Sequence, residues 1–153
     1  MRYTTTKHQE MQGIIRLYKS ETGETEVDMH KVAEFATKMG VPLPKPSNPV
    51  DLLAAEFARA AREETKIDKT TGQPYRVNHA IPVGQTTFWI DIDEAPREPM
   101  LKSLINQREQ MVGDGLQLTL DADHWNSIHQ NEEPIQLPLD FTEDIQWRKM
   151  GLG

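Results

Sequence analysis

Apolar residues recur at helical spacing over the first 61 positions and predict three amphipathic helices. Asp28 is placed to cap the second helix, and Pro49 suits the first position of the third. Gly23 and Gly40 mark the ends of the first two. The stripes are Met11, Ile14, Ile15 and Tyr18, then Val32, Phe35, Ala36 and Met39, then Val50, Leu53, Ala54, Phe57, Ala60 and Ala61.

The spacing changes to strict alternation after the third helix, which predicts β-structure. One strand is expected over Tyr75, Val77, His79 and Ile81, and a second over Phe88, Ile90 and Ile92. Residues 82–85 can connect them. Ile67 precedes a turn-like segment and is expected to begin a further short strand.

Helical spacing returns at residues 97–112, and Gly113-Asp114-Gly115 is expected to end that helix. Alternating leucines then predict a short extended segment over residues 116–120. Asp121 or Asp123 could cap a brief helix beyond it. Residues 134–141 should be extended, and Thr142 is expected to cap a terminal turn or two.

This order of elements predicts an α+β protein that is mainly helical. Three helices followed by a β-hairpin is the order of a winged-helix domain, expected here over residues 1–95. Residues 96–133 would form a helical extension packed on that domain. Residues 134–153 would form an extended acidic tail with a short terminal helix.

Composition narrows the protein class. The chain has no cysteine, which excludes disulfides and thiolate chemistry. No run approaches the roughly 20 apolar residues of a membrane helix, and the first residues lack the apolar stretch of a secretory signal. We therefore expect a cytoplasmic protein with no membrane partner and no cofactor.

The net charge of −7 argues against a surface adapted throughout to polyanions. The charge is uneven, however, since residues 1–80 carry 12 Lys and Arg against 11 Asp and Glu. In a winged-helix reading, cations on the third helix and the start of the hairpin would contact DNA phosphates. These candidates are Arg59, Arg62, Lys66, Lys69 and Arg76. Because Glu56, Glu63 and Glu64 lie beside them, a solvated mixed-charge surface is the alternative.

The tail contains the hexapeptide Gln136-Leu137-Pro138-Leu139-Asp140-Phe141. It resembles the peptide by which bacterial proteins bind the replication sliding clamp. The resemblance implies that Leu139 and Phe141 enter an apolar pocket of a protein partner while the Gln136 amide makes directional hydrogen bonds. Alternation of Ile135, Leu137, Leu139 and Phe141 is also typical of a strand that covers the chain's own core.

A catalytic role has one candidate site. Asp121, Asp123, His124 and His129 could bind a divalent metal and activate water, as in a hydrolase or nuclease. Their spacing is poor, because His124 and His129 are five residues apart and diverge on a helix. His79 alternates with apolar residues and is expected to be partly buried and hydrogen-bonded rather than a catalytic base.

Two longer segments, residues 97–126 and 140–148, resemble uncharacterised bacterial proteins without an assigned activity. This resemblance implies a bacterial source but no mechanism. The sequence thus favours a noncatalytic module that binds DNA, or a protein partner through residues 136–141. The alternatives are the metal-dependent hydrolase or nuclease, and a structural protein in which helix 97–112 pairs with its copy in another chain.

Overall fold

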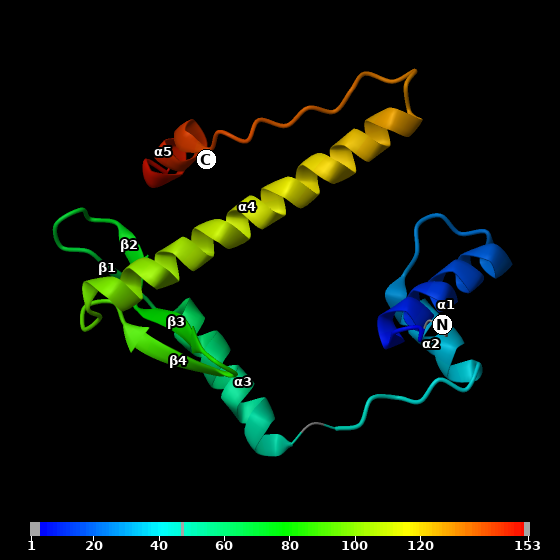
Figure 1. The fold of residues 1–153 in the computed structure, drawn as a ribbon, viewed down its shortest axis with the longest axis horizontal. Coiled ribbons are helices and arrows are strands. Elements are labelled where there is room, and N and C mark those ends of the chain that lie inside the picture. The colour runs from blue at the N-terminus through cyan, green and yellow to red at the C-terminus, as the bar shows by residue number, and fades with distance from the viewer. Residues whose placement is uncertain (1–3, 47, 152–153) are drawn as a thin grey trace. The chain divides into compact units, whose positions relative to one another are not determined.

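A computed structural model describes residues 4–46 and 48–151 of the chain (Figure 1). It is a mainly helical α+β protein, which confirms the predicted fold class. The chain divides into two compact units, Met1–Asn48 and Pro49–Gly153. The elements are α1 (Lys7–Thr22), α2 (Met29–Lys38), α3 (Pro49–Glu63), β1 (Thr65–Ile67), β2 (Pro74–Arg76), β3 (Asn78–Val83), β4 (Thr86–Asp91), α4 (Arg97–Ile128) and α5 (Thr142–Lys149).

The first unit is a pair of helices with side-chain caps. Thr6 and Gln9 form a capping box at the start of α1, and the Asp28 carboxylate accepts the His30 amide at the start of α2. Tyr18 is buried and meets the Phe35 ring edge-to-face at 5.5 Å. The hydrogen bond between the His30 amide and the Asp28 carboxylate confirms the capping role predicted for Asp28.

The second unit begins with α3, which packs on β3. The boundary between the two units lies between Asn48 and Pro49. It therefore falls inside residues 1–95, the region expected to form a winged-helix domain. A joint core of all three helices stays a prediction. No helix in the described ranges is both long and apolar enough to cross a membrane.

Two small antiparallel sheets follow α3, β1 with β2 and β3 with β4. Gly84 and Gln85 form the turn between Val83 and Thr86, which are partners in the register of the second sheet. The single strand predicted over Tyr75–Ile81 is wrong, because it is interrupted at Val77. The buried Val77 donates its amide to the Glu64 carbonyl and accepts the Ile92 amide, so it links both sheets.

The long helix α4 differs most from what the sequence predicts. It continues through Gly113, Asp114 and Gly115 to Ile128, so the extended segment predicted over residues 116–120 is helical. The two glycines do not adopt the left-handed conformation that ends a helix at Gly23. Asp121 and Asp123 therefore lie inside α4 and cap nothing.

The C-terminal segment turns back after α4 and runs beside it (Figure 1). Residues 133–141 have no regular secondary structure, and all of them are exposed. The Asn126 side chain holds Ile135 by two hydrogen bonds, accepting its amide at 2.8 Å and donating to its carbonyl at 2.9 Å. Thr142 is the first residue of α5 and not its cap; its amide and hydroxyl instead donate to Asp140.

Candidate functional site

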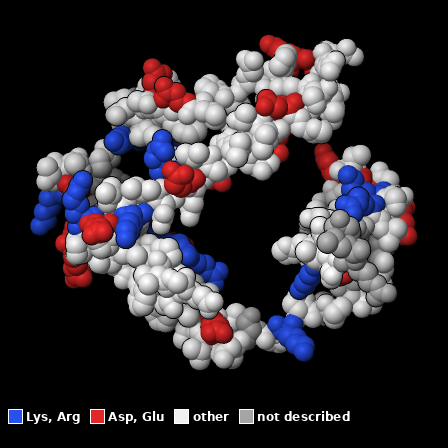
Figure 2. All heavy atoms as spheres, in the orientation of Figure 1, with Lys and Arg blue, Asp and Glu red and all other residues white. Residues whose placement is uncertain are grey.

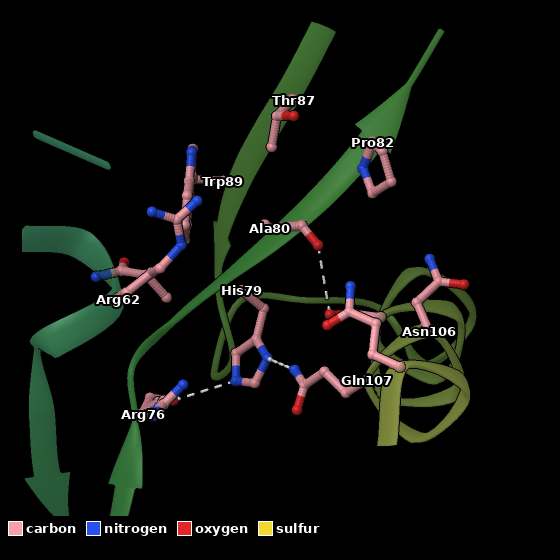
Figure 3. A pocket seen from close by; sticks show the side chains of 12 residues that line it. Arg62, Arg76, His79, Ala80, Pro82, Thr87, Trp89, Asn106 and Gln107 are labelled. Atoms are coloured by element: carbon pink, nitrogen blue, oxygen red, sulfur yellow. Dashed lines mark hydrogen bonds between the residues drawn. The ribbon is translucent and has the colours of Figure 1, made fainter. Parts of the chain in front are cut away.

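The candidate site is a polar hollow of about 500 Å³ in the second unit (Figure 3). Its walls come from the end of α3, strands β2 to β4 and the first half of α4. Two arginines line it, and none of the described residues that line it is a carboxylate. The lining residues are Arg62, Arg76, Asn78, His79, Ala80, Pro82, Thr87, Trp89, Ser103, Asn106, Gln107 and Gln110.

Arg62 comes from α3 and contacts Trp89 of β4. Its guanidinium carbon lies over the Trp89 ring, 5.1 Å from the ring centre (Figure 3). Such a cation–π contact holds the guanidinium in place without neutralising its charge. Asn78 joins β3 to the end of α3, donating to the Ala61 carbonyl at 3.1 Å and to the Glu64 carboxylate at 2.9 Å. The nearby Glu64 carboxylate is thus bound by Asn78.

His79 lies at the base of the hollow and is 8% exposed. Its Nε2 is 3.2 Å from the Arg76 carbonyl oxygen, and its Nδ1 is 3.4 Å from the Gln107 side-chain nitrogen. The arrangement is satisfied by a neutral ring that donates from Nε2 and accepts at Nδ1. Both ring nitrogens have partners, so the predicted role as a buried, hydrogen-bonded histidine is confirmed.

Ser103 fixes α4 against β3 from the opposite wall. It is 4% exposed, and its hydroxyl donates to the Ala80 carbonyl at 3.4 Å. Further along α4, Gln107 points towards His79 of β3 (Figure 3). The hollow therefore combines two cations, an aromatic ring and side-chain amides, a set that can bind an anion bearing further hydrogen-bonding groups.

Arg62 and Arg76, both predicted from the sequence, line this hollow. Arg59, Lys66 and Lys69 were predicted with them, but they are not among its lining residues. Figure 2 shows Lys and Arg side chains gathered over the region of β1 and β2, with Asp and Glu interspersed. The structure thus concentrates two of the five predicted cations at one concave site.

Sequence reasoning missed Trp89 and the amides of α4. Trp89 alternates with the apolar positions predicted for β4, so it falls on the other face of that strand. Asn106, Gln107 and Gln110 share one side of α4 at spacings of three and four residues. The available signal was this cluster of side-chain amides on one side of the helix.

The structure does not assemble a metal centre from the predicted residues. Asp121 accepts from Gln117 at 2.8 Å, and the His129 ring stacks on Trp125 at 4.2 Å. In residues 4–46 and 48–151, no three His, Asp or Glu side chains are grouped so that they could hold a metal ion. The hydrolase alternative therefore gains no support from the described residues.

The predicted docking peptide, residues 136–141, lies along α4. Leu139 and Phe141 line a groove with residues 108–119 of that helix. Gln136 and Leu137 line its continuation near Asn126. Leu137 and Leu139 remain about half exposed.

No protein-family model, curated protein or solved structure matches this chain.

Proposed function

We propose that this chain is a noncatalytic DNA-associated module that binds backbone phosphate at the polar hollow. The proposal is carried by Arg62 and Arg76, which share one concavity lined by no described carboxylate. A phosphate at this point would accept charge-assisted hydrogen bonds from both guanidinium groups. The chain's net charge of −7 would then limit contact to this local region.

The other lining groups support an adjoining sugar or base. Trp89 and the Arg62 guanidinium provide flat surfaces of the kind on which bases stack. Asn106 and Gln110 offer both donors and acceptors. The volume of about 500 Å³ is within the range of small-ligand sites and admits one nucleotide unit.

Fluorescence anisotropy with labelled DNA at two salt concentrations tests the proposal. Arg62→Gln and Arg76→Gln should each weaken binding and reduce the salt slope by about one. Arg59→Gln is the matched control, because Arg59 lies on the same helix but outside the hollow. Equal affinities and slopes for the wild type and both hollow variants would reject phosphate binding at this site.

Binding of a protein partner through residues 136–141 is a second candidate function. The observation that favours it is that residues 133–141 are exposed and have no regular secondary structure. The hydrogen bonds described between this segment and α4 are the two that join Asn126 to Ile135. Such a segment can leave α4 at low cost and bind elsewhere as an extended peptide. A synthetic peptide of residues 134–146 should bind purified sliding clamp, and Leu139→Ala with Phe141→Ala should abolish that binding. Equal binding by both peptides would exclude this recognition mode.

A further inference from the structure

An apolar groove runs along the middle of α4. A cavity of about 490 Å³ is bounded by α4 on one side and by Leu139 and Phe141 on the other. A second cavity of about 480 Å³ adjoins it at Met111 and Phe141. The C-terminal segment therefore lies beside α4 without filling the space between them. The α4 residues lining the first cavity are Arg108, Met111, Val112, Gly115, Leu116 and Thr119.

An apolar seven-residue repeat along α4 meets this groove at Met111 and continues to Leu118, which lines the cavity near Asn126. Leu104, Met111, Leu118 and Trp125 recur at intervals of seven and supply one of the two positions by which paired helices meet. Leu104, Met111 and Leu118 are 47%, 51% and 41% exposed. The repeat is continuous because α4 does not end at Gly113, and the apolar side it creates is only partly covered.

Gly115 lies on the same side, between Met111 and Leu118. A glycine inside a helix costs about 1 kcal/mol relative to alanine. A Cβ at Gly115 would meet no described atom within 4 Å, so no described part of this chain requires the glycine. Close approach of a second helix would require it.

The chain exposes more surface than compact units of its mass, which leaves room for an interface with a partner. The chain exposes 13758 Å². A compact protein of this mass exposes roughly 7,900 Å², and two separate compact bodies of the same total mass roughly 9,400 Å². The difference of about 4,000 Å² exceeds what each chain buries in most stable homodimers.

Charge along α4 favours a second copy in the opposite direction. Residues 113–128 carry three carboxylates, Asp114, Asp121 and Asp123, and no Lys or Arg. Residues 97–112 carry Arg97, Lys102 and Arg108 against two glutamates. An antiparallel pair places each acidic half beside a half with one more cation than carboxylates, whereas a parallel pair places the two acidic halves together.

We propose that α4 of a second copy of this chain fills the groove and runs antiparallel to the first. Gly115 then lies where the two helix backbones approach, and Met111 and Leu118 of the repeat form the contact. Leu139 and Phe141 bound the partner helix from the other side of the groove. This proposal does not depend on DNA binding.

Sedimentation equilibrium of the full chain tests it, with a dimer expected at micromolar concentration. Leu118→Glu should give a single-chain mass. Leu120→Glu is the matched control, because Leu120 is 52% exposed on α4 but lines none of the described cavities along the groove. A single-chain mass for the wild type, or equal effects of the two variants, would overturn the proposal.

A second pair of variants gives a result even if Leu118→Glu fails to fold. Alanine at either Gly113 or Gly115 favours the helix by a similar amount. Gly115→Ala should nevertheless weaken the dimer about tenfold or more, because the added methyl group meets the partner backbone. Gly113→Ala, on another side of α4, should leave the dimer constant unchanged. Equal dimer constants for the two variants would contradict pairing at Gly115.

Discussion

The Arg62 guanidinium lies 5.1 Å from the centre of the Trp89 ring, so α3 and β4 are joined at the edge of the polar hollow. The contact gives Arg62 a defined position while its charge remains available to a ligand. Its contribution to stability should be modest, since Arg62 is exposed.

A double-mutant cycle should measure this contact directly. Arg62→Ala and Trp89→Ala should couple by about 0.5–1 kcal/mol in the free energy of unfolding. Urea denaturation of the wild type, both single variants and the double variant gives this coupling energy. Strictly additive effects would show that the two side chains do not interact in solution.

The hydrogen bonds of His79 should stabilise the fold around the hollow. His79→Phe removes the partners of the Arg76 carbonyl and the Gln107 amide, and should lower the free energy of unfolding by about 1–3 kcal/mol. Denaturant unfolding measures the loss. His8→Phe is a suitable control because His8 is exposed in the first unit. Equal stability of the two variants would indicate that the His79 hydrogen bonds contribute nothing net.

The cap of α2 should contribute to helix stability in the first unit. Asp28→Ala removes the acceptor of the His30 amide and should cost about 1 kcal/mol, whereas Asp28→Asn should retain most of the cap. Amide hydrogen exchange in α2 reports the difference. Unchanged protection in the alanine variant would show that the cap is not formed.

The Asp68 turn should weaken in acid. The amides of Thr71 and Thr70 donate to the Asp68 carboxylate and hold its pKa below the usual value. Because the pKa is lower in the folded state, the stabilisation is present at neutral pH and is lost as the pH falls below about 4. NMR chemical shifts of the Thr70 and Thr71 amides should change over this range. In Asp68→Asn that change should be absent; its persistence would assign the transition to another group.

Local signals were sufficient for much of the secondary structure. Asp28 identified the start of α2 because its carboxylate can reach a free helical amide. Pro49 likewise marked the first position of α3, and alternation identified the hairpin of β3 and β4. These features depend on residues near one another in sequence, so their physical causes can be read directly.

Features set by distant contacts were not predictable in the same way. Val77 interrupts a predicted strand because its amide and carbonyl bond to Glu64 and Ile92. Glycines at 113 and 115 suggested a helix end, although glycine permits left-handed geometry without requiring it.

For the hollow, Arg62 and Arg76 could be proposed from their charge. The contribution of Trp89 required knowing which face of β4 meets α3.

The paired hydrogen bonds between Asn126 and Ile135 make one backbone amide informative about the contact between α4 and the segment that follows it. The side-chain amide of Asn126 engages the Ile135 backbone much as a neighbouring β-strand would. Hydrogen exchange at Ile135 therefore requires its bond to Asn126 to open, as it does whenever this part of the segment leaves α4. The exchange rate of the Ile135 amide thus measures how often this contact opens in the chain by itself, before a partner is added.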